Sequence, residues 1–309
     1  MLMITVLAGG TGSIKLVRGL SYLCDDLNIV SNIGDNFWFH NLYICPDIDT
    51  IIYGISNILD RKRGWGIKND TFNFINHMKK LKEPSWFKIG DRDLSTHVLR
   101  TRLIKEGLSL SKITKLISDR YGIKSRIIPI SDDHIETRIV TSKGDMHLQE
   151  FWIKNKANLK ISSIYYKGIN DANSNKEAIN VLNKSNLIVI PPANPISSIG
   201  PMISFKDFRQ CLVKNRHKIV AVSPIIKDKP VSGPAKKYMK TFNIDITPVA
   251  IAKYYSDFIS SFIISTSDIK YKHEINKLKI TSYETNIMME NIRDEKRLAK
   301  FLIDTFNYK

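Results

Sequence analysis

Residues 3–12, which read MITVLAGGTG, decide the fold, because an apolar run passes directly into a glycine-rich loop. Residues 3–7 are continuous aliphatic and β-branched residues, which is typical of a short buried strand. After the loop, aliphatic residues recur at helical spacing, namely Leu16, Val17, Leu20 and Leu23. Strand character returns over residues 27–33. The chain therefore opens with a strand, a glycine loop, a helix and a second strand.

The same alternation returns in the second half of the chain. Residues 187–190 and 218–222 are continuous apolar runs, as found in parallel strands that are covered on both faces. A helical segment over residues 206–214 separates them. The two halves together predict an α/β fold with a Rossmann-like, doubly wound and mostly parallel sheet.

The middle of the chain departs from this alternation. Helical periodicity covers residues 72–81, 98–103 and 113–117, and Gly107 and Gly122 are suited to end helices. This pattern predicts a helical insertion.

A β-hairpin excursion is predicted next, because residues 138–141 and 146–153 flank a turn that contains Gly144. At the end of the chain, the spacing of apolar residues over 298–306 predicts an amphipathic helix that closes the core.

Length and composition agree with this organisation. The chain has 309 residues, of which 43% are hydrophobic and 25% charged, as in an ordinary globular protein. We expect a single composite domain over residues 1–309, with a core formed by 1–60 and 165–309 and an insertion of about 61–164.

Charge and cysteine usage limit the classes of partner. The net charge of +17 favours anionic partners, but the lysines are spread along helices, which is typical of solvated faces. No nucleic-acid motif or zinc cluster accompanies the charge, so we expect no nucleic-acid partner. The three cysteines are widely spaced, no basic leader precedes the first strand, and no apolar stretch reaches about 20 residues. We therefore expect a cytoplasmic protein with reduced thiols and no membrane contact.

The glycine loop is the first candidate site. Gly9, Gly10, Thr11 and Gly12 place backbone N–H groups at a helix N-terminus, where these donors and the helix dipole stabilise phosphate oxygens. The spacing matches neither the dinucleotide fingerprint nor the Walker motif, so a purely structural turn is the alternative. Lys15, one turn into the helix, is either a further phosphate ligand or a solvated side chain.

Paired carboxylates form the second candidate site. In residues 46–50, PDIDT, Asp47 and Asp49 are two residues apart, and an extended segment would point them the same way. Such a pair suits Mg²⁺, which takes one or two carboxylates together with substrate phosphates. The alternative is that one of them caps a helix over residues 50–59. Asp35, after the second strand, is placed either to meet a ribose or to form a turn.

The third candidate is a charged segment over residues 88–97, KIGDRDLSTH, just before a helix. Lys88 and Arg92 are suited to bind a phosphate or an anionic ring. The alternative is that the segment only caps the helix and forms surface ion pairs.

Polar loops also follow the later strands. Residues 194–201 follow the strand at 187–190, and Ser223 follows the strand at 218–222. Ligands of open α/β sheets bind at the carboxyl ends of the strands, so we expect these loops and residues 232–234 around one crevice. Each loop alone is equally consistent with an ordinary turn.

Six motifs follow one another at compatible spacing: LAGGTG (7–12), PDIDT (46–50), GDRD with TH (90–97), SDD (131–133), NP with SIGP (194–201), and SPI with SGP (223–234). Together they closely resemble the 2-phospho-L-lactate transferase (CofD-like) family, from about residue 3 to the C-terminus. The resemblance implies transfer of a 2-phospholactyl group from lactyl-2-diphospho-5'-guanosine to the deazaflavin FO, which releases GMP and forms coenzyme F-420-0. Some relatives use the phosphoenolpyruvyl donor instead.

The resemblance also implies roles for particular residues. Asp49 and Lys88 are placed against FO, with Arg92 beside them, and Asp47 and Asp49 are the candidates to hold Mg²⁺ or to activate the hydroxyl. The guanosine diphosphate part is expected at Gly9, Gly10, Thr11, Gly12, Lys15, Asn194, Ser198 and Ser223. A homodimer is also expected.

Two other classes compete with this interpretation. The gluconeogenesis-factor-like branch of the same superfamily, a nucleotide-sugar or dinucleotide-binding regulatory class, shares the glycine opening, but the segments 46–50 and 90–97 argue against it. A dinucleotide-dependent oxidoreductase would need the G-x-G-x-x-G fingerprint, which this loop lacks.

Overall fold

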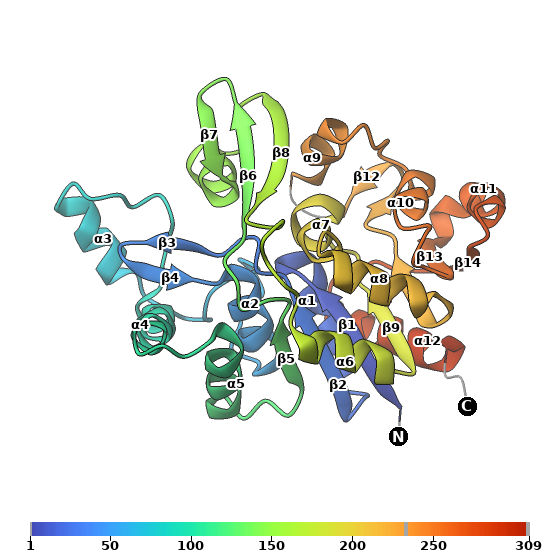
Figure 1. Ribbon diagram of the computed structural model, residues 1–309, viewed down its shortest axis with the longest axis horizontal. Coiled ribbons are helices and arrows are strands. Elements are labelled where there is room, and N and C mark those ends of the chain that lie inside the picture. The colour runs from blue at the N-terminus through green and yellow to red at the C-terminus, as the bar shows by residue number, and fades with distance from the viewer. Residues whose placement is uncertain (1, 232–233, 307–309) are drawn as a thin grey trace.

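The centre of the molecule is a seven-stranded sheet in which every strand is parallel to its neighbours (Figure 1). The structure is a computed structural model and describes residues 2–231 and 234–306. The strands lie in the spatial order β14 (Thr281–Thr285), β13 (Ser261–Ser265), β10 (Ile219–Val222), β9 (Leu187–Ile190), β1 (Met3–Ala8), β2 (Asp26–Ser31) and β5 (Arg126–Pro129). The predicted Rossmann-like, doubly wound α/β fold is confirmed.

The direction of winding reverses between β1 and β9. The chain proceeds from β1 to β2 and β5 on one side, and from β9 to β10, β13 and β14 on the other. Val6 of β1 pairs with Ile29 of β2 and with Val189 of β9. At such a reversal the following loops leave the sheet in opposite directions and open a crevice at the carboxyl ends of the strands. The glycine loop after β1 and the Asn-Pro loop after β9 flank this crevice.

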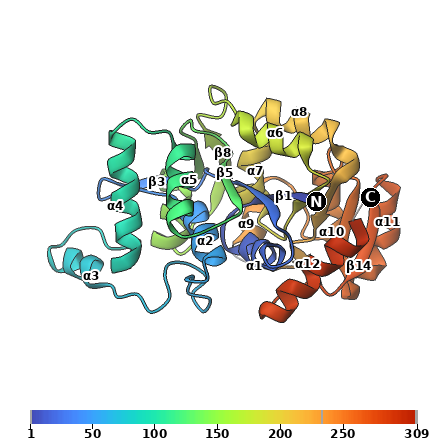
Figure 2. The same cartoon turned by 90° about the horizontal axis from the view of Figure 1, so that it is seen from below.

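Helices cover both faces of the sheet (Figure 2). α1 (Gly10–Ser21) and α12 (Ile292–Phe306) lie on one face, and α6 (Lys176–Lys184) and α8 (Lys206–Lys214) on the other. Because both faces are covered, β9 and β10 are buried along their whole length, which explains their continuous apolar runs.

The C-terminal helix is fixed to the first helix by a buried ion pair. Arg18 of α1 donates two hydrogen bonds to Glu295 of α12, one of them from Nε to Oε2 at 2.7 Å, and both side chains are almost fully buried. Gly19 lies beside them, and a Cβ at that position would overlap with the backbone carbonyl of Glu295. The absence of a side chain at Gly19 therefore allows α1 and α12 to approach closely, as a core-closing terminal helix requires.

Short elements complete the second half of the chain. They are α7 (Gly200–Ile203), the 3₁₀ helices η3 (Arg216–Lys218) and η4 (Thr266–Tyr271), β11 (Ile225–Ile226), β12 (Lys229–Pro230), α9 (Ala235–Thr241), α10 (Pro248–Tyr254) and α11 (Lys272–Lys277). No described helix is both long and apolar enough to cross a membrane.

The predicted helical insertion is present beside the sheet (Figure 1). It comprises α3 (Asn73–Lys80), α4 (Asp91–Lys105) and α5 (Leu110–Arg120), and it follows the hairpin β3 (Phe37–Phe39) and β4 (Leu42–Ile44) and the helix α2 (Pro46–Ile55). Gly107 and Gly122 follow α4 and α5 with φ values of 85° and 67°, so both act as the predicted helix stops. β5 lies within the range expected for the insertion, yet it forms the edge of the main sheet.

The predicted hairpin is part of a three-stranded antiparallel sheet in the order β7 (Gly144–His147), β6 (Glu136–Thr141) and β8 (Ile161–Lys167). The expected second strand over residues 146–153 is wrong beyond His147. The chain turns there into a π-helix, η1 (Glu150–Lys154), which buries Phe151 against Tyr238 of α9 at a ring distance of 6.1 Å. Burial of this ring therefore replaces continued pairing with β6.

Candidate active site

A cavity of about 450 Å³ lies at the carboxyl ends of β1 and β9, and both the sheet and the insertion contribute to its wall. The sheet half includes Gly10, Thr11, Gly12, Asp35, Asn194, Ser197 and Ser198. The other half includes Asp47, Asp49, Tyr53, Arg63, Trp65, Trp86, Phe87, Lys88, Asp93 and His97. A cavity of this size suits a small-molecule ligand.

The glycine loop forms one end of the cavity. Gly9 is the N-cap of α1, and Gly10 begins the helix with a φ of +44°. A Cβ at Gly9 would overlap with Ser198, and a Cβ at Gly10 would overlap with the carboxylate of Asp47. Glycine is therefore required at both positions for the close approach of other elements, and the N-terminus of α1 lies at the cavity, as phosphate binding requires.

Lys15 does not contribute to this end of the cavity. Its Nζ donates a hydrogen bond to the carbonyl of Met289 at 2.6 Å, and the side chain is not part of the cavity wall. The helix rotation between Gly12 and Lys15 directs the lysine toward the segment before α12. The glycine loop therefore has no lysine of its own helix at the cavity.

Asp47 and Asp49 lie within the first turn of α2 and not on an extended segment. Two residues along a helix correspond to a rotation of about 200°, so their side chains diverge, and the expectation that they point the same way is wrong. Neither residue is the N-cap, which is Cys45. Both carboxylates reach the cavity, but with different neighbours.

Asp47 faces a second carboxyl group. Asn32, at the end of β2, donates from Nδ2 to Asp47 at 2.8 Å and to Asp35 at 3.4 Å. Burial raises the pKa of Asp47 to about 7, and burial together with the charge of Asp47 raises the pKa of Asp35 well above its usual value. Asp35 and Asp47 thus form a buried acidic pair, and both accept a hydrogen bond from the neutral side-chain amide of Asn32.

Asp49 is paired with a buried arginine from α4. Arg100 donates from Nη1 to Oδ2 of Asp49 at 3.0 Å and from Nη2 to Oδ1, which is a bidentate ion pair. His97 adds a contact, since its Nδ1 lies 3.6 Å from Oδ2 of Asp49 and 3.3 Å from Nη1 of Arg100. The charge of Asp49 is therefore compensated within the protein.

The network continues to Asp93 and Tyr53. Nε2 of His97 lies 3.3 Å from Oδ1 of Asp93, and the hydroxyl of Tyr53 donates to the same oxygen at 2.8 Å. Burial alone would raise the pKa of Asp93, but the neighbouring His97 and the hydroxyl of Tyr53 lower it overall. The charges on this side of the cavity are therefore compensated within the protein, while Nε2 of His97 and Nε of Arg100 have no hydrogen-bond partner among the described residues.

The charged segment over residues 88–97 divides between the cavity and the surface. Lys88, Asp93 and His97 line the cavity. Arg92 does not: its side chain is 57% exposed, and its Nη2 donates to the carbonyl of Lys68. Arg92 follows the first residue of α4, where the helix points it away from the cavity, so its position does not support contact with FO.

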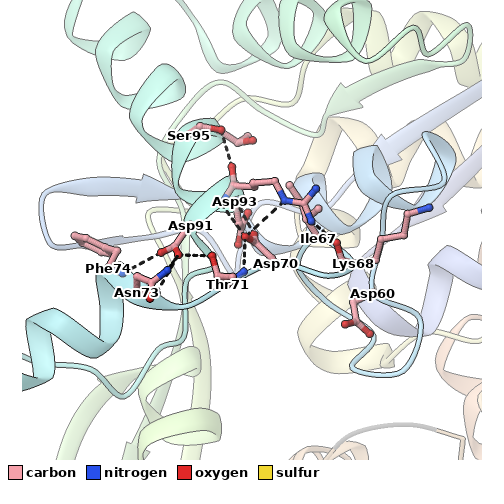
Figure 3. A network of polar contacts seen from close by, with 12 residues as sticks. Asp60, Ile67, Lys68, Asp70, Thr71, Asn73, Phe74, Asp91, Asp93 and Ser95 are labelled. Carbon is pink, nitrogen blue, oxygen red and sulfur yellow. Dashed lines mark hydrogen bonds and ion pairs between the residues drawn. The ribbon is translucent and has the colours of Figure 1, made fainter.

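Asp91 of this segment caps α3, while the start of α4 is capped by Asp70, which lies outside the segment (Figure 3). Asp70 accepts the N–H groups of Arg92 and Asp93 at the start of α4, and Asp91 accepts those of Asn73 and Phe74 at the start of α3. Hydrogen bonds, the strongest of them from Thr71, lower the pKa of Asp91 to about 2. The capping alternative therefore accounts for the part of the segment that faces solvent.

The loops after β9 and β10 have different roles. Oδ1 of Asn194 accepts the N–H groups of Ile196 and Ser197, which begins the π-helix η2 (Pro195–Ile199) and presents Ser197 and Ser198 to the cavity. Ser223 is fully buried and bonded to Ile225, outside the cavity wall. The Ser223 hydroxyl, which was expected to bind the nucleotide, is therefore occupied by hydrogen bonds to the backbone of Ile225. Ser232 and Gly233 lie outside the described residues.

The predicted motif over residues 131–133 is structural. Asp132 accepts hydrogen bonds from Ser111 at the start of α5, while Ser131 and Asp133 bind the backbone of Asn173. Among the described residues, none of these three side chains lines the cavity.

Sequence reasoning missed several residues of the site, among them Asn32, Tyr53, Arg63 and Arg100. Asn32 precedes Asp35 in the loop after β2, so its position at a strand end was a usable signal. Arg100 lies on α4, and only packing of the insertion brings it to Asp49 of α2. Arg63 lies in a loop that packs against the glycine loop. Neither arginine belongs to a recognisable sequence motif.

Comparisons with known proteins identify the family of the chain. The family model described as 2-phospho-L-lactate transferase CofD matches residues 4–303. The 2-phospho-L-lactate transferase of Methanosarcina mazei is 37% identical over 97% of this chain and 99% of its own length, and that of Methanocaldococcus jannaschii is 34% identical over 97% of each chain. A solved structure of a UPF0052-family protein from Bacillus halodurans has a TM-score of 0.65 at 12% identity, covering 98% of both chains. This last likeness concerns the fold alone.

Proposed function

The chain belongs to the 2-phospho-L-lactate transferase CofD family, and we propose that it transfers the 2-phospholactyl group from lactyl-2-diphospho-5'-guanosine to the deazaflavin FO. The products are GMP and coenzyme F-420-0. The phosphoenolpyruvyl compound is the alternative donor. A cytoplasmic location and a homodimer belong to the same proposal.

One observation carries the proposal: a single cavity joins a phosphate-binding helix terminus to an aromatic wall with a lysine. The glycine loop, Ser197 and Ser198 provide one end, and Trp86, Phe87 and Lys88 provide the other. A nucleotide diphosphate at the first end and a flat anionic ring at the second would bring the two reacting groups together between Asp47 and Asp49.

The carboxyl groups around Asp47 are suited to bind Mg²⁺. The second carboxyl group of the proposed magnesium site is that of Asp35, and not that of Asp49 as the sequence suggested. Asp49 is already paired with Arg100, whereas Asp47 and Asp35 are two buried carboxyl groups without a basic partner among the described hydrogen bonds. Asp35 and Asp47 would therefore hold the ion, together with donor phosphates. When bound, the ion supplies positive charge that offsets the charge of the phosphates.

The residues of the chain act mainly by positioning. Asp49, held by Arg100 and His97, is placed to accept a hydrogen bond from the acceptor hydroxyl, and Lys88 is placed to bind the ring of FO. The hydroxyl oxygen forms a bond to the phosphorus that carries lactate, the bond from that phosphorus to the GMP oxygen breaks, and the hydroxyl proton passes to solvent. No covalent intermediate on the enzyme is required.

A transfer assay tests the proposal. The purified protein is incubated with FO, Mg²⁺ and the lactyl or enolpyruvyl donor, and GMP and the phosphorylated deazaflavin are separated and quantified. We expect stoichiometric GMP and F-420-0 with one donor, and loss of both products in Asp47→Asn. Absence of product with both donors would contradict the proposed function.

A further inference from the structure

The cavity contains more acidic than basic side chains, although the chain as a whole carries a charge of +17. Four aspartates line it, at positions 35, 47, 49 and 93, whereas Arg63 and Lys88 are the lysine and arginine side chains of the described wall. Lys88 lies beside the aromatic residues, and Lys15 points elsewhere. A donor with a diphosphate and a carboxylate therefore meets one arginine, Arg63, in the described part of the wall.

Arg63 belongs to a loop, residues 60–67, that packs against the glycine loop. Gly64 lies so near Thr11 that a Cβ on Gly64 would be 3.0 Å from Cγ2 of Thr11. The two loops therefore form adjoining parts of the same end of the cavity, although about fifty residues separate them along the chain.

The Arg63 side chain is held in place from several directions. Nη2 donates to the carbonyl of Ile67 at 2.9 Å and lies 3.0 Å from Oδ2 of Asp60, both of which appear in Figure 3. The guanidinium carbon lies 5.2 Å from the ring centre of Trp65 and 4.9 Å from that of Phe72. These contacts restrict the rotamers before any ligand binds, which reduces the entropy lost on binding.

One donor of this guanidinium has no partner. Nε of Arg63 is buried and finds no hydrogen-bond acceptor among the described residues. A buried donor left unpaired costs about 1–3 kcal/mol. Nε of Arg100 and Nε2 of His97 are unpaired in the same way, so the case for Arg63 rests on its position in the cavity wall and on its charge. Arginine forks bind phosphate and carboxylate oxygens in particular.

We propose that Arg63 is a catalytic residue whose guanidinium binds an oxyanion of the donor, either on the phosphoryl group that is transferred or on the adjoining carboxylate. This inference rests on the proposed function. It assigns the neutralisation of charge on the donor to a residue of the insertion, not to the helix that carries the glycine loop.

The experiment compares wild type with Arg63→Ala, Arg63→Lys and the matched control Arg61→Ala. Arg61 is an exposed arginine two residues earlier and is not part of the cavity wall. Transfer rates are measured with FO, Mg²⁺ and the donor, and calorimetry measures binding of GDP, donor and FO separately. Circular dichroism and thermal melting confirm that each variant is folded.

We expect Arg63→Ala to lower kcat/KM by about 10³-fold, as loss of an arginine at a transferring phosphoryl group does. Arg63→Lys should recover part of the rate, and Arg61→Ala should stay within about twofold because an exposed charge has little effect. Weaker GDP binding in Arg63→Ala assigns the contact to phosphate, whereas unchanged GDP binding with weaker donor binding assigns it to the carboxylate.

Other outcomes would overturn the inference. Wild-type turnover in Arg63→Ala would remove Arg63 from the reaction, and selective loss of FO affinity would place it with the acceptor. If wild type binds GDP but transfers nothing, the proposed function fails while the GDP comparison still decides whether Arg63 binds phosphate. A wild type that neither binds GDP nor transfers would overturn both.

Discussion

Asp47 and Asp49 lie in the same helical turn, yet they belong to two different electrostatic regions of one cavity. Asp47 faces Asp35 and shares the amide of Asn32 with it, and burial raises its pKa to about 7. Asp49 is held by the fully buried Arg100 and flanked by His97. Among the described residues no basic side chain pairs with the first region, whereas the second contains Arg100.

The difference reflects which parts of the molecule surround each carboxylate. The insertion brings in Arg100 and His97, so the charge of Asp49 is compensated without a ligand. Asp35, after β2, and Asp47, on α2, lie close together at the N-terminus of α1, so bound protons, a bound cation or both stabilise this region. Under the proposed function, a preformed site for the acceptor lies next to a donor site that is completed by its ligands.

Of the changes that test the difference between the two regions, replacement of Arg100 should have the largest effect on stability. Arg100→Met leaves Asp49 buried and unpaired, and we expect a loss of about 3–5 kcal/mol in the free energy of unfolding. Urea denaturation at neutral pH measures it. Arg102→Ala on the same helix is the control, because Arg102 is 62% exposed and forms only a surface pair with Glu106. A loss below about 1 kcal/mol in Arg100→Met would show that Asp49 does not depend on this pair.

The pH dependence of stability should show a smaller effect from the Asp47 region. The folded pKa of Asp47, about 7, lies above its ordinary value of 3.8, so the stabilising contribution is complete below pH 3.8 and is lost as pH rises through 7. Between pH 5 and pH 8, in EDTA, we expect wild type to lose at least about 1.4 kcal/mol, the equivalent of one pKa unit.

Asp47→Asn keeps an acceptor for Asn32 but removes the titrating group. Its unfolding free energy should therefore change less than that of wild type between the same two pH values, while transfer activity is lost. Equal pH dependence in the two proteins, measured by urea denaturation, would mean that Asp47 does not carry the raised pKa.

The smallest effects are expected from two cations that the sequence suggested and the structure places outside the cavity. Lys15→Ala and Arg92→Ala should retain kcat/KM within about twofold, because exposed charges contribute little. Lys88→Ala, which removes a cation from the cavity wall, should raise the KM for FO. If Lys15→Ala abolished GDP binding, the glycine loop would have to recruit that lysine during turnover.

Four strands of the sheet, β1, β2, β9 and β10, could be predicted from the sequence, whereas β5, β13 and β14 were not. The buried runs at β1, β9 and β10 are continuous because parallel strands covered on both faces have no solvent side. The failure at residues 148–153 has the opposite cause: the apolar run continues, but Phe151 packs against a helix nearly ninety residues away instead of against a neighbouring strand. Periodicity alone does not distinguish these two uses of an apolar run.

The sequence by itself determined the parallel α/β fold, the glycine loop at the N-terminus of α1 and the set of polar segments from which the cavity is built. Tertiary structure alone decided that Asp49 meets Arg100, 51 residues away, that Asp47 meets Asn32 and Asp35, and that Arg63 is part of the cavity wall while Lys15 is not. Periodicity and turn residues report local backbone geometry. The charge state of a buried carboxyl group depends on the side chains within a few ångströms of it. Packing brings these side chains together from distant parts of the sequence, so local sequence patterns do not predict them.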